Sequence, residues 1–280
     1  MRLFVNAIIF VIIAALSACS HSKLKQSVTD SIQQKKKTNK TQPVIKKDTV
    51  AYSYVHLDTR NNKCEKCDYI AISYPIFKNV HELNDAITTT LYNYINEYGD
   101  QKIADNSDFR VAFKKFAKTY GADSDSSDVN KPAATTFDYN INIEIQDSSL
   151  IVLSLQEESS GGAHPNHRTS FLNWNTKANK SIELEDIFIE GYEDKLTTIA
   201  ENIFRKEEGL SQKDSLGSYF FENGVFALND NFRITPKGIN FYYNFYEIKP
   251  YSEGPTDLLI PYTSIKNLLR PNTVISQYLK

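Results

Sequence analysis

Two histidines, His164 and His167, are the residues of this chain whose types and spacing are best suited to chemistry. They stand as His-x-x-His within a segment from Ser159 to Trp174, and two imidazoles at that spacing could share a metal ion. A zinc site needs three or four ligands from the protein. The remaining histidines are distant along the sequence: His21, His56 and His81. The ligand count argues against a metal, so we predict no metal site and no cofactor.

The loop that carries these histidines is expected to be rigid. Gly161 and Gly162 permit a positive φ or a close backbone approach, and Pro165 favours extended geometry before it. The tip then presents four polar side chains, which are His164, Asn166, His167 and Arg168. Two interpretations remain open. In one, His164 and Asn166 bond to backbone groups and serve the loop itself, and in the other the tip contacts a ligand.

Catalytic signatures are absent from the sequence, which has no Gly-x-Ser-x-Gly, His-Glu-x-x-His or phosphate-binding loop. Ser159 or Ser160 with His164 as base would imitate a nucleophile site, but their closeness in sequence forces an unusual geometry. Glu157 and Glu158 would form a carboxylate pair of the glycosidase type. Neighbouring strand residues point to opposite faces, which separates that pair. We predict no catalytic residues and no enzymatic activity.

The three cysteines have two predicted roles. Cys64 and Cys67 form a Cys-x-x-Cys in a turn before a strand, whereas a thioredoxin-like motif places its first cysteine at a helix N-terminus. No second pair exists to complete a four-cysteine zinc site. In an oxidising compartment an even pair favours a local disulfide. We predict that Cys64 and Cys67 are bonded to each other.

The third cysteine, Cys19, ends a pattern typical of an export signal. Arg2 precedes an apolar run from Leu3 to Leu16, and Leu-Ser-Ala-Cys follows. This order resembles a lipobox, so residues 1–19 are predicted to be a lipoprotein signal peptide with Cys19 lipidated. The alternative, an uncleaved anchor, is disfavoured because a spanning helix needs about 20 apolar residues. The expected location is the cell envelope, anchored in the outer membrane and facing the periplasm.

Charge is divided unevenly along the chain. Residues 1–50 hold nine basic and two acidic residues, whereas residues 51–280 hold 23 basic and 32 acidic residues, a net charge of −9. The segment 20–50 is polar and basic, too poor in apolar surface to order itself, and we expect a tether beside anionic headgroups. An exported, lipid-anchored chain is not expected to bind nucleic acid. The net negative charge of residues 51–280 favours basic partners.

Hydrophobic periodicity indicates the elements that must hold these residues. Alternating strands are expected at 52–56, 70–76, 137–145 and 150–156, and a hairpin at 232–248. Ile76 is expected on the buried face of its strand, and Phe245 on the face that Phe241 and Tyr243 share. Helical spacing occurs at 80–98, 109–120 and 196–204. The polar linker at 122–134 is typical of a domain boundary. We predict an α+β fold of antiparallel sheets and packed amphipathic helices, in two α/β subdomains at 51–121 and 135–275.

Two sequence signatures resemble a known family. One contains Gly161–Asn166 and continues from Phe171 to Phe188, and the other is Tyr246–Pro255 followed by Ile260–Tyr262. They are similar to the domain of unknown function in the extracellular part of the anti-sigma factor RsiV, which also occurs beside the peptidoglycan deacetylase domain of PdaC. The resemblance covers most of residues 50–270. It implies an RsiV-like α+β domain at 135–275, and RsiV's domain is a receptor for lysozyme.

The chain departs from that family in two ways. Ala178 and Asn179 replace the glycine expected before Lys180, although asparagine tolerates left-handed φ. A lipobox stands in place of the membrane span of RsiV, and the chain has no deacetylase domain.

The expected function is therefore a non-catalytic binding or sensing module for a basic lysozyme-like protein or a peptidoglycan-related ligand. The alternatives are a peptidoglycan-acting hydrolase and a structural lipoprotein without a small ligand. The predicted contacts lie on the two signature loops: Gly161, Gly162, His164, Asn166, His167, Arg168, Tyr251 and Gly254.

Overall fold

The computed structural model describes residues 49–61, 67–98, 108–120, 134–147, 149–160 and 164–279. The predicted signal peptide, nearly all of the predicted tether, Cys64, Gly161 and Gly162 lie outside the described residues. Residues 47–280 form one compact unit. In the described part of the chain, no helix has the length and apolar character that crossing a membrane requires.

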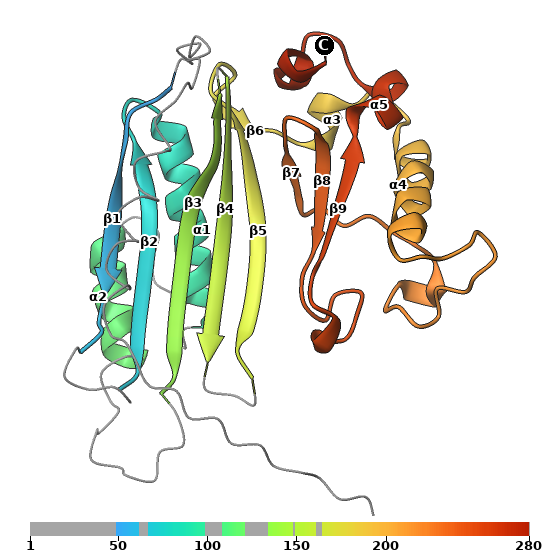
Figure 1. Ribbon diagram of the computed structural model, residues 1–280. Helices are drawn as coiled ribbons and strands as arrows, with labels where there is room; N and C mark the ends of the chain where they lie inside the picture. The colour runs from blue at the N-terminus through green and yellow to red at the C-terminus, as the bar shows by residue number, and fades with distance from the viewer. Residues whose placement is uncertain are drawn as a thin grey trace, which may run out of the picture. The chain divides into compact units, whose positions relative to one another are not determined.

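A six-stranded sheet has its strands side by side in chain order (Figure 1). They are β1 (Tyr52–Asp58), β2 (Tyr69–Phe77), β3 (Thr136–Asp147), β4 (Leu150–Ser160), β5 (Asn166–Asn175) and β6 (Lys180–Ser181). Neighbouring strands are antiparallel except β2 and β3, which are parallel. Parallel pairing needs a long crossover, and α1 (His81–Tyr98) and α2 (Phe109–Tyr120) lie in that connection.

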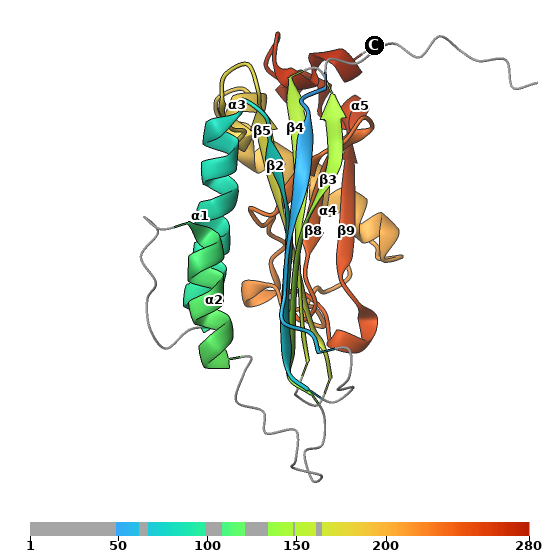
Figure 2. The same cartoon turned by 90° about the vertical axis from the view of Figure 1, so that its left-hand side faces the viewer.

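The two crossover helices pack on one face of this sheet (Figure 2). Their apolar residues recur every three or four positions, as a single buried helical face requires. The buried members include Leu83, Ile87 and Leu91 of α1 and Ala112 and Phe116 of α2. They share a core with strand residues such as Ile72, Tyr139 and Trp174. The helices predicted at 80–98 and 109–120 are confirmed.

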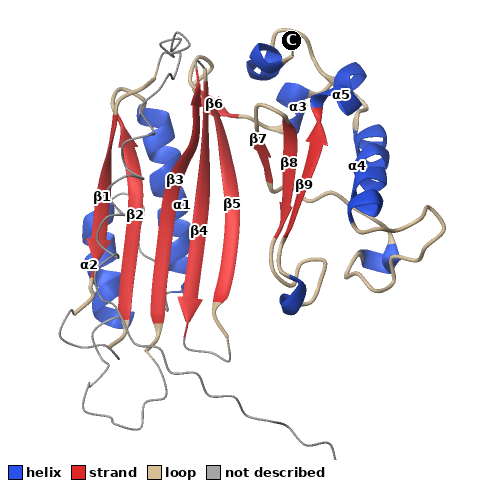
Figure 3. Cartoon of the chain, viewed as in Figure 1, coloured by secondary structure: helices blue, strands red, loops and turns tan. Residues whose placement is uncertain are grey.

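A three-stranded antiparallel sheet follows in the chain, made of β7 (Phe232–Ile234), β8 (Gly238–Tyr243) and β9 (Thr256–Pro261) (Figure 3). The helices of this region are α3 (Leu184–Ile187), α4 (Glu193–Glu207) and α5 (Tyr262–Ile265). Short 3-10 helices complete it: η1 (Glu222–Gly224), η2 (Tyr251–Glu253), η3 (Lys266–Leu268) and η4 (Val274–Tyr278). Buried Phe204, Phe241 and Leu258 belong to a second core. This antiparallel sheet with its helices confirms the predicted α+β class.

Strand β4 contributes to both cores, because successive side chains point to opposite faces of a strand. Leu150 and Val152 belong to the second core, whereas Ile151 and Leu153 belong to the first. Residues 150–155 are buried without interruption. A continuous apolar run is typical of a strand covered on both faces. The six-stranded sheet is therefore packed on both sides at β4.

The strand pairing does not follow the predicted division at 122–134. Strand β2, from the predicted subdomain 51–121, pairs directly with β3, from the predicted subdomain 135–275. The two segments share one sheet, and one of its pairs is parallel where only antiparallel pairs were expected. The polar linker marks a long connection between adjacent strands, and it does not separate two sheets.

Two strands depart from simple alternation. Ile76 was expected on the buried face of β2, but it is 37% exposed while Phe77 is buried. The alternation breaks at Pro75, which has a fixed φ and no N–H to donate. Strand β3 shifts register between Ile143 and Ile145. Such bulges bend a strand and change its local twist.

Candidate functional site

The two signature loops, distant in sequence, meet in the folded chain. The His164 ring stacks on the Tyr251 ring with centroids 4.2 Å apart. The Tyr251 hydroxyl donates to the Pro165 carbonyl at 2.9 Å. His164 Nδ1 lies 3.0 Å from the same carbonyl, which can only accept. A neutral His164 therefore accepts at Nε2 from the Tyr246 hydroxyl, 3.1 Å away.

These rings are part of a larger group of stacked and tilted rings. Phe245 lies 4.7 Å from Tyr251 and 5.6 Å from His167, centroid to centroid. Tyr246 lies 5.5 Å from Tyr251. We call these five residues the aromatic cluster: His164, His167, Phe245, Tyr246 and Tyr251. Separations of this size are those at which aromatic pairs attract each other.

Backbone-mimicking hydrogen bonds hold the second loop against β5. Asn244 Oδ1 accepts from the Thr169 N–H at 2.6 Å, and Asn244 Nδ2 donates to the Thr169 carbonyl at 3.1 Å. Asn231 Nδ2 donates to that carbonyl at 2.8 Å. Glu247 Oε2 in turn accepts from the Asn244 N–H at 2.7 Å. The Asn244 side chain thus occupies the place of a strand partner and positions the residues that follow it.

Tyr246 is held in an unfavourable backbone conformation and is largely open to solvent. Its φ is +63°, and its side chain is 53% exposed. A left-handed conformation costs an ordinary residue about 1–2 kcal/mol. Gly254, at φ +73°, has no atom near the position of a Cβ. Gly254 therefore supplies backbone freedom to the turn after η2.

A cavity of about 320 Å³ lies beside the aromatic cluster. Its lining comprises Asn140, Gln156, Glu157, Glu158, His167, Thr169, Tyr242 and Phe245. The carboxylate of Glu158 lies 3.8 Å from His167 Nδ1. Burial raises the pKa of the Tyr242 hydroxyl above its usual range. The cavity joins a carboxylate to aromatic walls, a combination that suits a cationic side chain.

Arg168 does not join the aromatic cluster, because it points to the opposite face of β5 from His167. Its guanidinium lies 3.5 Å from Glu97 of α1. It lines a separate cavity of about 130 Å³ with buried Glu157 and Tyr139. Burial, and next the nearby Glu157, raise the pKa of Tyr139. Of the predicted tip residues, Asn166 is exposed at the start of β5.

In the part of the chain that the structure describes, His164 is not paired with a serine. Its Nδ1 faces the Pro165 carbonyl and its Nε2 faces the Tyr246 hydroxyl, whereas the Ser160 hydroxyl lies 2.8 Å from the Thr136 hydroxyl. Glu157 is buried and Glu158 exposed, as expected for opposite faces of β4. Within the described ranges, no three His, Cys, Asp or Glu residues are grouped as metal ligands. Cys67 is disulfide-bonded; its pairing with Cys64 stays a prediction.

Phe245 and Tyr246 were not among the predicted contacts. Phe245 was expected on the apolar face of the hairpin with Phe241 and Tyr243. Strand β8 ends at Tyr243, and the Asn244 side chain is bonded to Thr169 of β5. Phe245 therefore lies beyond the strand, where its ring contacts His167 and Tyr251. The sequence did contain a signal for Tyr246 as a contact residue, because Tyr246 is the first residue of the second signature. Tyr262, in contrast, is buried, and its hydroxyl donates to the Thr235 carbonyl at 2.8 Å.

Residues 185–263 match the DUF3298 family, described as a protein of unknown function. The DUF3298 match contains the Tyr246–Pro255 signature and begins after the Gly161–Asn166 one. No curated protein matches the chain.

Two solved structures of DUF3298 proteins share the fold. The one from Bacteroides fragilis NCTC 9343 is 20% identical, with a TM-score of 0.65, covering 83% of this chain and 99% of that chain. The one from Pseudomonas aeruginosa PAO1 is 19% identical, with a TM-score of 0.62, covering 81% and 97%. At this identity the DUF3298 structures establish the fold and leave the ligand open.

Proposed function

We propose that this protein is a non-catalytic, lipid-anchored binding module of the cell envelope, and that a basic protein of the lysozyme type is its partner. One observation carries the proposal: two distant loops meet to present the aromatic cluster at the surface. Exposed tyrosine and histidine rings held by mutual stacking are ordered before binding, which lowers the entropic cost of association.

The chemistry of the surroundings supports a basic partner. Tyrosine is enriched among the residues that dominate protein interfaces. The cavity beside the cluster adds the Glu158 carboxylate, and residues 51–280 carry a net charge of −9. Opposite charge speeds the encounter with a cationic protein. The resemblance to the lysozyme-receiving domain of RsiV supports the same class of partner.

The strain at Tyr246 also supports a binding role. Its φ of +63° places a large side chain where glycine would be more stable. Unfavourable backbone conformations cluster at binding and catalytic sites. Here the strained residue is the most exposed tyrosine of the cluster, so its conformation serves the surface more than the core.

The test is a calorimetric titration of a basic lysozyme into the full-length chain in detergent, at low and at physiological salt. We expect saturable binding that weakens as salt screens the opposite charges. Tyr246→Ala should cost about 2 kcal/mol of binding free energy, roughly a thirtyfold loss of affinity. Tyr52→Ala is the matched control, because Tyr52 is 49% exposed on β1, away from the aromatic cluster.

Absence of binding at both salt concentrations would contradict the choice of partner. Equal losses for Tyr246→Ala and Tyr52→Ala would contradict the choice of surface. A lysozyme that stays fully active when saturated would show that the contact leaves its active site free. Retention of the chain on purified peptidoglycan, with no lysozyme binding, would favour the other predicted ligand class. Hydrolysis in a peptidoglycan zymogram would overturn the non-catalytic assignment.

A further inference from the structure

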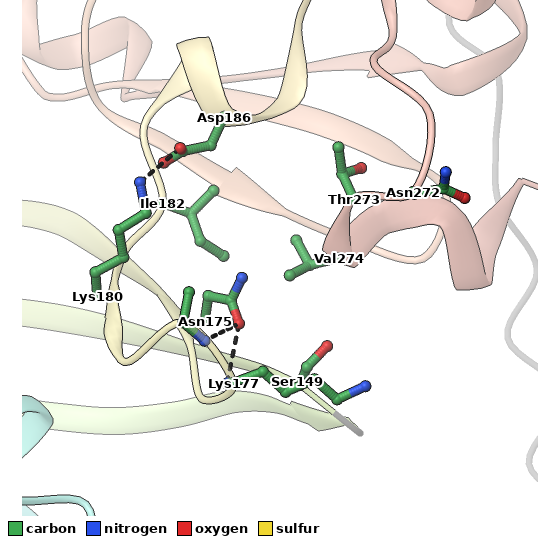
Figure 4. A pocket seen from close by; sticks show the side chains of 10 residues that line it. Ser149, Asn175, Lys177, Lys180, Ile182, Asp186, Asn272, Thr273 and Val274 are labelled. Carbon is green, nitrogen blue, oxygen red and sulfur yellow. Dashed lines mark hydrogen bonds and ion pairs between the residues drawn. The ribbon is translucent and has the colours of Figure 1, made fainter.

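A third cavity, of about 380 Å³, is shown in Figure 4. It lies at the far end of β5 from the aromatic cluster. Four segments line it: the turn before β4, the turn between β5 and β6, the segment from β6 to α3, and residues 272–274. Asn175, the last residue of β5, is part of the wall, whereas His167 stands near the first residue of that strand.

Hydrogen-bond donors without partners face this cavity. Asn175 Oδ1 accepts from the N–H groups of Lys177 and Ala178, each at 3.0 Å. The amide NH₂ of Asn175 is therefore left to donate, and it points into the cavity (Figure 4). Ser149 also lines the cavity and is only 9% exposed. The hydroxyl of Thr273, another lining residue, is buried without a hydrogen-bond partner among the described residues. Buried polar groups normally have a partner, so the Thr273 hydroxyl indicates a missing one.

The wall is positively charged in an acidic molecule. It holds Lys177, Lys180 and a single carboxylate, Asp186. Lys180 Nζ lies 2.6 Å from Asp186, so these two charges offset each other. Although burial opposes it, the hydrogen bond from Lys180 keeps the pKa of Asp186 below its usual range. Lys177 makes no ion pair with the described residues, and its charge is the one available to a ligand.

Two apolar side chains also line the cavity. They are the side chains of Ile182, which is buried, and of Val274, and both face the space beside Asn175 (Figure 4). A bare oxyanion would leave this wall uncovered, and the volume exceeds what a single such group needs. A ligand that fills the site has an anionic end and a short apolar part.

We propose that this cavity binds a small organic anion, a carboxylate or phosphate monoester with a short apolar group. Lys177, the Asn175 amide and the Ser149 hydroxyl hold the anionic end, and Ile182 and Val274 cover the apolar part. The Lys180–Asp186 pair keeps the wall in place. This site is separate from the aromatic cluster, so it does not depend on the partner proposed above.

The experiment titrates butyrate, butyl phosphate, inorganic phosphate and butanol into the full-length chain in detergent, read by calorimetry and by the melting temperature. We expect butyrate or butyl phosphate to bind saturably and raise the melting temperature, and butanol to do neither. Inorganic phosphate should bind more weakly than butyl phosphate. The two phosphates separate the contribution of the anionic group from that of the apolar wall.

Lys177→Gln should weaken binding of the organic anion about tenfold or more, the effect of losing one charged hydrogen bond. Lys213→Gln is the matched control, because Lys213 is exposed on another loop and lines none of this cavity. The melting temperature without ligand should not change in either variant. Ser149→Ala should also weaken binding.

Two results would overturn the proposal: no saturable binding of any anion by the unmodified chain, or equal losses in Lys177→Gln and Lys213→Gln. Equal binding of inorganic phosphate and butyl phosphate would overturn the role of the apolar wall.

Discussion

At the scale of single residues, Tyr246 is expected to contribute to binding of the partner and not to the stability of the fold. Its ring is exposed and its φ is +63°. Glycine adopts that conformation without steric cost. Tyr246→Gly should therefore leave the free energy of unfolding in urea within about 1 kcal/mol of the starting value, or raise it, while the affinity for the partner falls. Tyr52→Gly, within strand β1, should instead lower stability by about 0.5–1 kcal/mol. A loss above 2 kcal/mol for Tyr246→Gly would assign the ring a structural role.

His164→Ala is likewise expected to weaken binding of the partner without unfolding the chain. The hydrogen bonds of His164 are at the surface, and truncation of a surface side chain typically changes the free energy of unfolding by no more than about 0.5 kcal/mol.

A second residue-scale prediction concerns alkaline pH. Burial, and next the hydrogen bond to Glu185, raise the pKa of Tyr192 to about 12, whereas an unfolded tyrosine titrates near 10. The unfolded chain therefore loses this proton first. The contribution of Tyr192 to stability is complete below pH 10 and disappears as pH rises from about 10 to 12. Denaturant unfolding across that range should show a smaller pH dependence in Tyr192→Phe.

Tyr219 provides an independent check, because burial and then Glu208 raise its pKa to about 12 as well. The double variant with Tyr219→Phe should flatten the pH dependence further. An unchanged slope in both variants would contradict the assignment to these tyrosines.

At the scale of elements, Asn173 connects β5 to β7. Its side chain is buried, Nδ2 donates to the Phe232 carbonyl at 2.9 Å, and Oδ1 accepts from the Ile234 N–H at 2.9 Å. Asn173→Ala leaves two buried backbone groups without partners, and each costs about 1–3 kcal/mol. We expect a loss of roughly 2–4 kcal/mol in urea unfolding.

Asn142 is the control for this prediction. It is bonded to Gln156 on the exposed side of β3 at 3.1 Å, so Asn142→Ala should change stability within about 0.5 kcal/mol. If Asn173→Ala costs no more than Asn142→Ala, water replaces the lost bonds and Asn173 does not hold the two strands together.

At the scale of the whole molecule, the predicted lipid anchor determines where the acidic part acts. Cys19→Ala should release the chain from membranes or leave the unprocessed precursor, because no thiol remains to carry the lipid. Membrane fractionation and the intact mass of the protein measure the outcome. Cys67→Ala is the control and should leave the membrane fraction unchanged. An unaltered mass and distribution in Cys19→Ala would refute lipidation.

Local chemistry was sufficient to predict the long helices and strands of the described chain. The stripes of α1 and α2 and the alternation of β3 lie within short segments, and a helical or strand face depends only on residues a few positions apart. The same locality explains the separation of Glu157 from Glu158. It does not extend to Ile76, where the burial pattern of β2 changes at Pro75 although the pairing with β1 stays in register.

The candidate site could not be predicted in the same way. His164 contacts Tyr246, 82 residues away, only because Asn244 pairs with the backbone of Thr169 and fastens one loop to the other. The parallel pairing of β2 with β3 across the linker is likewise a contact between segments that are distant in the sequence. Sequence by itself determined the long helices and strands and named both loops, since periodicity and turn residues act locally. Only the tertiary structure decided that the loops form one surface and that Arg168 lies outside it, because contacts between distant segments depend on how the sheets pack.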